Sequence, residues 1–183
     1  MLAVARDVSR VQTDNVEAVS ATLDDERAMR DAIRGADIVF CAIGAPPSSK
    51  DMVRSRATAA IIAAMRAENV QRLVALSSHG VGQERLELPW FFRFVVLPFF
   101  LERVFADHDT QEKLLLTSGL DYTIVKPPHL KNGKSFGPLM HGPSDTSPIA
   151  NGRMKITRDD VAGFMVQVAQ ENQYLRSAVS VSS

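Results

Sequence analysis

LVALSSHG at residues 73–80 and YTIVKPPH at residues 122–129 are short apolar runs that each end in hydroxyl, imidazole or proline side chains. Such runs, bounded by turn residues and separated by a helical pattern, are typical of buried strands in a parallel sheet. Ligands of open α/β sheets bind outside the carboxyl ends of the strands. We therefore expect the residues that follow both strands to line a ligand site.

Strand and helix patterns alternate along the rest of the chain. Further strands are predicted at 2–7, 16–19, 38–43 and 178–181, and helices at 22–33, 51–68, 102–117 and 157–168. Thr22 and Thr157 each precede an acid by three residues and resemble helix N-caps, and Gly35 stands where a helix stops. This alternation predicts an α/β fold with a doubly wound parallel sheet.

Right-handed crossovers place the carboxyl ends of all parallel strands on one rim of such a sheet. The residues that the sequence places at this rim are Arg6, Gly44, Ser78 and His129.

The composition is that of one soluble globular domain spanning residues 1–183, with 45% hydrophobic and 23% charged residues. The net charge is zero, so the composition lacks the excess of basic residues that is typical of nucleic-acid-binding proteins. The lone Cys41 excludes an intrachain disulfide, suits the reducing cytoplasm and is expected to be buried and inert. No signal-peptide pattern and no metal-ligand spacing are visible, so we expect a cytoplasmic protein without a metal site.

The most hydrophobic segment covers residues 89–101. It contains an arginine and a central proline and is shorter than the ~20 residues that a membrane-spanning helix needs. We expect a lid over a pocket or a buried insertion, and a segment at a membrane interface is the alternative.

Several segments resemble the atypical short-chain dehydrogenases/reductases, and within them the NAD(P)H-binding group that includes biliverdin-IXβ/flavin reductase and the NmrA-like proteins. The similar segments are 4–10, 36–39, 63–66, 77–78, 107–108 and 118–129. The resemblance implies a Rossmann-like fold that lacks its first β-α unit, because the family begins with a strand and a G-x-x-G-x-x-G turn that binds the pyrophosphate. We accordingly expect an N-terminally truncated domain, and weak NADPH binding by the 183-residue chain.

Two arginines and a glycine are candidates for cofactor contacts. Arg6 and Arg10 follow the first strand, where arginine accommodates the 2′-phosphate of NADP; solvated surface arginines are the alternative. Gly44 would let backbone approach a ligand closely, or would simply turn the chain. The resemblance favours NADPH, with NAD as the second choice. Further cofactor contacts implied by the resemblance are Ser77, Pro127 and Pro128.

Three residues are candidates for catalysis. Ser78 resembles the serine that the family places beside the nicotinamide, although serine at a strand end also bonds local backbone. His129, fixed by two prolines, could orient a substrate or relay a proton, or be a solvated loop residue. His108 is expected at a helix start, and with Glu112 it occupies the spacing of the family's tyrosine-x-x-x-lysine pair. The histidines without an expected role, placed at the surface, are His79 and His141.

The missing tyrosine argues against alcohol–carbonyl oxidoreduction. The first hypothesis is an NADPH-dependent reductase that transfers hydride to a flat conjugated acceptor of the flavin, quinone or tetrapyrrole class. The alternatives are a non-catalytic NmrA-like dinucleotide sensor or scaffold, and an epimerase-like or isomerase-like enzyme on the same fold.

Overall fold

Strands and helices alternate as predicted in the computed structural model, which describes residues 1–11, 15–46, 49, 51–86, 88, 90–146 and 154–183. The strands are β1 Leu2–Ala5, β2 Glu17–Ser20, β3 Ile38–Cys41, β4 Arg72–Leu76, β5 Asp121–Lys126, β6 His129–Lys131, β7 Met140–Pro143, β8 Lys155–Thr157 and β9 Ser177–Ser182. The α-helices are α1 Glu26–Ile33, α2 Val53–Ala67, α3 Glu102–Leu116 and α4 Arg158–Gln170. Short 3-10 helices are η1 Val8–Arg10, η2 Gly82–Leu86 and η4 Ser144–Thr146, and η3 Phe92–Leu101 is a π-helix.

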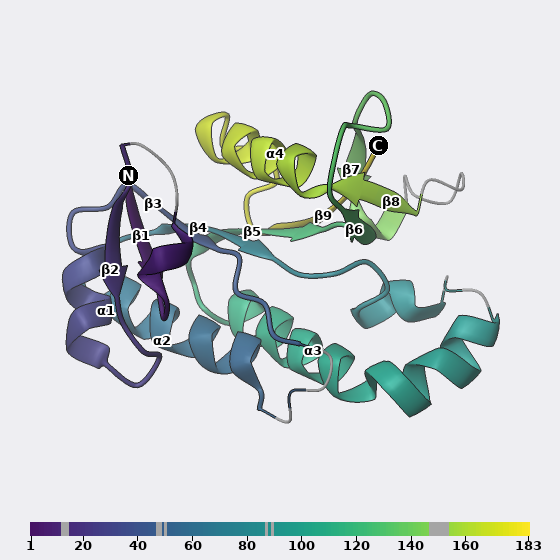
Figure 1. The fold of residues 1–183 in the computed structure, drawn as a ribbon, viewed down its shortest axis with the longest axis horizontal. Coiled ribbons are helices and arrows are strands. Elements are labelled where there is room, and N and C mark those ends of the chain that lie inside the picture. The colour runs from purple at the N-terminus through teal and green to yellow at the C-terminus, as the bar shows by residue number, and fades with distance from the viewer. Residues whose placement is uncertain (12–14, 47–48, 50, 87, 89, 147–153) are drawn as a thin grey trace.

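The main sheet has the strand order β3-β4-β5-β9-β7, in which only β7 runs antiparallel to its neighbour. Helices α2 and α3 cover one face and α4 covers the other (Figure 1). Each face has its own apolar core: one includes Met65, Leu73 and Ile124, and the other includes Val125 and Phe164. Helices on both faces of a mainly parallel sheet confirm the doubly wound, Rossmann-like α/β fold.

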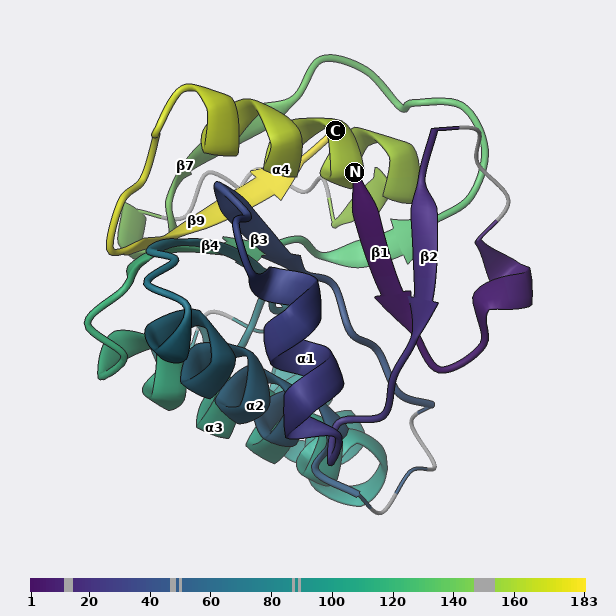
Figure 2. The same ribbon diagram turned by 90° about the vertical axis from the view of Figure 1, so that its left-hand side faces the viewer.

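Strands β1 and β2 form a separate parallel pair, with Leu2 opposite Glu17 and Ala5 opposite Ser20. In the described part of the chain, neither strand pairs with β3, and the pair stands apart from the main sheet in Figure 2. A cleft of about 1100 Å³ separates them, lined by β1, by the end of α1 and by β3. The parallel sheet is therefore interrupted between β1 and β3.

The helix ends show which sequence signals determine local structure. Thr157 caps α4 as expected, since its side chain accepts a hydrogen bond from the backbone N–H of Asp160 at 3.1 Å. Gly35 follows the end of α1 in the left-handed region at φ +74°, where glycine is unstrained. The Thr22 cap is wrong: Asp25 caps α1 by accepting from Ala28 N–H at 2.9 Å, so the helix begins at Glu26.

Where its side chains are described, the apolar segment 89–101 is not a buried insertion. Residues 92–101 form η3, and the side chains of Trp90, Phe91 and Phe94 are 72%, 55% and 62% exposed. Leu101 packs beside a small cluster around Phe105 and so joins this end of η3 to the body of the protein. Among the described residues, no helix combines the length and apolar character that crossing a bilayer requires.

Candidate active site

The ends of β4 and β5 continue side by side into the rim. Beyond the last paired residues, Ser77 N–H donates to the Val125 carbonyl at 2.8 Å, and His79 N–H donates to the Pro127 carbonyl at 2.9 Å. These bonds hold the Ser77–His79 segment against the segment that begins with Lys126. Two of the segments that the sequence singled out are thus brought together where a doubly wound sheet binds its ligand.

A buried polar cluster lies directly behind this rim. The Ser77 hydroxyl donates to Glu112 Oε1 at 2.5 Å, and Glu112 Oε2 lies 3.3 Å from Lys126 Nζ. Lys126 Nζ also lies 3.3 Å from Glu84 Oε2 and donates to the Val81 carbonyl at 2.8 Å. Helix α3, strand β5 and helix η2 therefore each contribute one charged side chain to the same cluster.

Lys126 and Glu84 were missed by the sequence analysis, which took only the Pro-Pro-His part of the segment at 126–129 as functional. Lys126 ends a buried run of β-branched residues, and a buried ammonium requires acceptors nearby. This position was the signal that could have identified Lys126 as part of a polar cluster. No pattern identified Glu84, since its charged partner Lys126 and its hydroxyl partner Ser180 both come from distant parts of the chain.

The two carboxyl groups beside Lys126 differ in their titration. Burial raises the pKa of Glu112 above its usual value, and the charge of Lys126 only partly opposes this effect. Burial also acts to raise the pKa of Glu84, but the neighbouring His79, Lys126, Ser180 and Gly80 N–H outweigh it, so that its pKa lies below the usual value. A proton is therefore held more readily on Glu112 than on Glu84.

His108 belongs to the same neighbourhood but is buried. Its Nδ1 lies 3.4 Å from Ser77 Oγ and 3.2 Å from Gln111 Oε1. Burial, followed by the charge of Arg54, lowers the pKa of His108 to about 4, so the imidazole is neutral near pH 7. The residue lies in the middle of α3 and not at its start, because the helix begins at Glu102.

Asp107 fixes the start of α2, which has no side-chain cap of its own. Its carboxylate accepts the backbone N–H groups of Arg54 at 3.0 Å and Ser55 at 2.9 Å. The Arg54 guanidinium lies 3.5 Å from this carboxylate and donates to the Ala45 carbonyl at 3.2 Å. Asp107 thus positions the loop that follows β3 and contains Gly44.

Arg6 and Gly44 line the same cleft between β1 and β3. Both are exposed, and among the described residues, chain neighbours aside, no heavy atom lies within 4 Å of the position that a Cβ at residue 44 would occupy. Packing therefore does not require glycine at this position. The backbone of Arg10 belongs to η1, but its side chain lies outside the described part of the structure.

The remaining predicted site residues lie along the same rim. Ser78 is half-buried, and its hydroxyl donates to the His79 carbonyl at 3.3 Å, which is the local bonding expected of serine at a strand end. Pro127 and Pro128 are buried, whereas His129 is exposed at the start of β6, where its N–H donates to the Met154 carbonyl at 3.3 Å.

The expectation for His79 is wrong. Its side chain is buried, with Nδ1 3.4 Å from Glu84 Oε2, because the β4–β5 pairing draws the residue under the rim. His141 is exposed as expected, and its Nδ1 lies 2.9 Å from the Tyr174 hydroxyl. Cys41 is buried as expected, and burial raises the pKa of its thiol.

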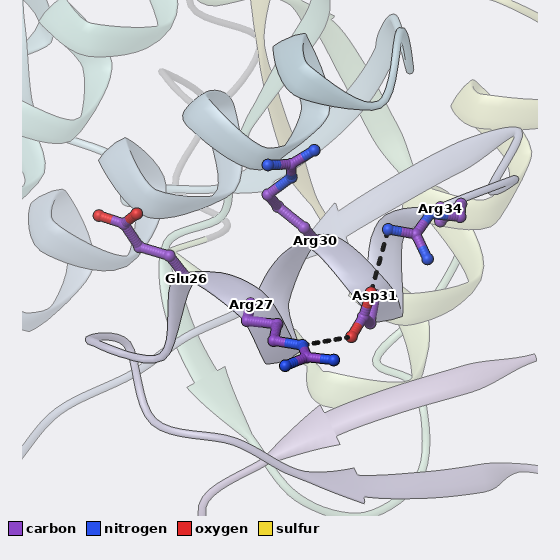
Figure 3. A pocket seen from close by; sticks show the side chains of 5 residues that line it. All are labelled: Glu26, Arg27, Arg30, Asp31 and Arg34. Atoms are coloured by element: carbon purple, nitrogen blue, oxygen red, sulfur yellow. Dashed lines mark ion pairs between the residues drawn. The ribbon is translucent and has the colours of Figure 1, made fainter.

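A second hollow, of about 480 Å³, lies on α1 and is lined only by charged residues (Figure 3). Arg27 and Arg34 pair with Asp31 at 3.8 and 3.0 Å, and Arg30 and Arg34 pair with Glu68 at 2.9 and 3.1 Å. These ion pairs compensate the arginines, and none of the lining residues comes from a strand end. The hollow is a charged helix surface and not a ligand site.

The fold and the rim are those of a dinucleotide-binding domain. The chain belongs to the NAD(P)H-binding family, whose model matches residues 1–172. Among solved structures, it is similar to a short-chain dehydrogenase/reductase from Veillonella parvula in complex with NADP, with 17% identity, a TM-score of 0.79, and coverage of 100% of this chain and 82% of that one.

Two further solved structures are similar to this chain. The oxidoreductase YlbE from Lactococcus lactis has 21% identity and a TM-score of 0.80, with 100% of this chain and 78% of that one covered. ChuY, an anaerobilin reductase from Escherichia coli, has 18% identity and a TM-score of 0.74, with 99% and 83% covered. The family confirms NAD(P)H as the cofactor class, and these neighbours confirm the resemblance to the short-chain dehydrogenase/reductase fold.

Arg6 and Gly44 line the cleft beside β1 and β3, and the Ser77–Ser78 and Pro127–Pro128 segments lie side by side at the rim, so the structure offers two places that could hold parts of NAD(P)H. The ten glycines of the sequence include no G-x-x-G-x-x-G turn for the pyrophosphate.

Proposed function

We propose that this protein is an NADPH-dependent reductase that transfers hydride to a flavin or a similar flat conjugated acceptor in the cytoplasm. The observation that carries the proposal is the continuous backbone pairing of Ser77–His79 with Val125–Pro127, which assembles one rim from the two segments. The cleft runs along β1 and β3 and includes Arg6 and Gly44, which follow the carboxyl ends of these strands, the region where dinucleotides bind in doubly wound sheets.

When bound, NADPH supplies the hydride, and the protein supplies binding and orientation. In this proposal, Arg6 and Arg10 hold the 2′-phosphate, which an arginine recognises through charge-assisted hydrogen bonds. Gly44 lets the backbone approach the cofactor, since in the described part of the structure no side chain fills the space beside it. Ser77 and the segment Pro127–Pro128 hold the nicotinamide end.

The acceptor lies, in this proposal, between Ser78 and His129. The Ser78 hydroxyl can turn from the His79 carbonyl toward a cofactor carboxamide or an acceptor carbonyl, because a hydroxyl rotates to suit its partner. The exposed His129 imidazole follows two buried prolines and is therefore free to contact a flat acceptor from a fixed backbone.

The tetrapyrrole class belongs among the candidate acceptors because ChuY, an anaerobilin reductase, shares this fold. In this proposal His108, which is buried and neutral near pH 7, does not take the part of the proton-donating tyrosine of alcohol–carbonyl enzymes.

Steady-state NADPH oxidation with and without FMN, a water-soluble quinone or biliverdin tests this function. A reductase oxidises NADPH only when an acceptor is present, and does so at a rate proportional to enzyme concentration. Tight NADPH binding with no turnover of any of the three acceptors would instead establish the NmrA-like sensor or scaffold.

A further inference from the structure

Lys126 stands between two carboxyl groups that cannot both be fully compensated by one ammonium. Glu84 Oε2 accepts from Gly80 N–H at 2.9 Å, and its Oε1 accepts from the Ser180 hydroxyl at 2.7 Å, in addition to the Lys126 contact. Among the described residues, the partners of the Glu112 carboxyl group are only Lys126 and the Ser77 hydroxyl. Two neighbouring buried carboxyl groups cannot both ionise easily beside a single ammonium. In the group of Lys126, Glu84 and Glu112, the negative charge therefore lies on Glu84, which has more donors, and Glu112 holds a proton.

The position of the two carboxyl groups relative to the rim also differs. The side chain of Glu84 is 4% exposed and that of Glu112 is 13% exposed. Glu112 contacts Ser77, which directly follows β4 and belongs to the rim itself. Glu112, which contacts the rim through Ser77, is therefore the residue of this group that holds the proton.

We infer that Glu112 is the proton source for the reduction, and that it delivers its proton through the Ser77 hydroxyl to the acceptor. In the structure the Ser77 hydroxyl donates to Glu112 Oε1 at 2.5 Å, and the relay reverses this bond: a hydroxyl is at once a donor and an acceptor, so Ser77 can accept from the protonated Glu112 while it donates to the acceptor. The inference rests on the proposed function and adds to it the origin of the proton, since Glu112 takes no part in binding NADPH.

The step balances in atoms and charge. Bound NADPH would supply the hydride, and the chain supplies the proton: the Ser77 hydroxyl gives its proton to the acceptor and regains one from Glu112. Glu112 is left as a carboxylate beside the Lys126 ammonium, which stabilises the new charge. Solvent returns the proton to Glu112 through its exposed edge before the next turnover.

This assignment predicts a pH dependence of known sign. The titratable groups that face Glu112 are Lys126 from β5, Glu84 from η2, and, through Ser77, the neutral His108 of α3. A proton source works only while protonated, so turnover is fully present below the pKa of Glu112 and falls as the pH rises through it. Burial raises the pKa of Glu112, so this loss of turnover occurs at a higher pH than it would with an ordinary glutamate.

The test compares the full chain with its Glu112→Gln variant, using NADPH and the acceptor that the wild type reduces best. General acids contribute about 10²–10⁴-fold to rate, so we expect kcat to drop by about 100-fold and to become independent of pH, with the Kd for NADPH unchanged. Glu102→Gln, the same substitution at an exposed position of the same helix, is the matched control and should leave kcat and its pH profile unaltered.

A spectroscopic measurement on the wild type keeps the test independent of the variant's folding. Infrared spectra recorded across the pH range should contain a carboxylic-acid C=O stretch that disappears with the same pKa as kcat. Glu112→Asp and Ser77→Ala should each shift this pKa or lower kcat. An ionised Glu112 at neutral pH, or a wild-type pH profile retained in Glu112→Gln, would overturn the inference while leaving the reductase intact. Absence of any turnover by the wild type would refute the reductase, and the proton source with it.

Discussion

Replacing Asp107 by alanine removes the side chain that closes the N-terminus of α2 from a neighbouring helix. Two backbone N–H groups, of Arg54 and Ser55, lose their acceptor, and the half-buried Arg54 guanidinium loses its counter-charge. Each hydrogen bond to a charged group contributes about 1.5–3 kcal/mol, so the lower figure for two bonds gives a loss of about 3 kcal/mol in the free energy of unfolding. Because the carboxylate is only 3% exposed, water cannot easily replace it.

Urea denaturation of the wild type and of Asp107→Ala measures this loss directly. Asp25→Ala is the matched control, because Asp25 caps α1 with one hydrogen bond at the surface and should cost only about 1 kcal/mol. Asp107→Asn keeps one acceptor oxygen and should fall between the wild type and alanine. If Asp107→Ala cost no more than Asp25→Ala, the reasoning about a second helix supplying the cap would be refuted.

The same carboxylate makes this contribution depend on pH. Burial acts to raise the pKa of Asp107, but the N–H groups of Ser55 and Arg54 and the Arg54 charge outweigh it, so the folded-state pKa is lowered. A lowered pKa means stability that is present above the unfolded value of about 3.9 and is lost as the pH falls through the folded value. The difference between wild type and Asp107→Ala should therefore shrink in acid.

Three further outcomes are expected. Arg6→Ala combined with Arg10→Ala should remove a preference for NADPH over NADH of at least about tenfold, since each charge-assisted bond to the 2′-phosphate contributes about 1.5–3 kcal/mol; equal Kd values for both cofactors in the wild type would contradict this role. His129→Ala should lower the rate of acceptor reduction in steady-state assays with little change in NADPH affinity, whereas Ser78→Ala should alter both; an unchanged rate in His129→Ala would remove the residue from the site. Gly80→Ala should reduce the melting temperature, because Gly80 has φ +85° and a Cβ there would lie 2.9 Å from the Leu88 side chain; an unaltered melting temperature would show that the loop adapts without cost.

The alternation of strands and helices could be predicted from the sequence because each element carries its own local signal. The β-branched run ending at Lys126 and the Thr157 cap act over a few residues, and both are found where expected. Thr22 failed because Asp25, three residues later, offers a carboxylate instead of a hydroxyl to the same helix end, and the helix begins after the stronger acceptor.

The composition of the buried cluster could not be predicted in the same way. Ser77 and Glu112 are 35 residues apart, and Glu84 meets Ser180 from 96 residues away. Such pairings depend on the order of the strands in the sheet and on which face α3 turns toward it. Neither property can be recognised from a periodic pattern in the sequence. His79 was misplaced for the same reason, since its burial depends on backbone pairing with Pro127.

The separation of β1 from β3 has a consequence for the behaviour of the chain in solution. A strand edge without a neighbour presents backbone N–H and C=O groups that can template pairing with another polypeptide. Leu2, Val4 and Phe40 are each more than a third exposed beside the cleft, so apolar side chains accompany these edges. These edges are therefore expected to favour self-association through β-pairing at high protein concentration.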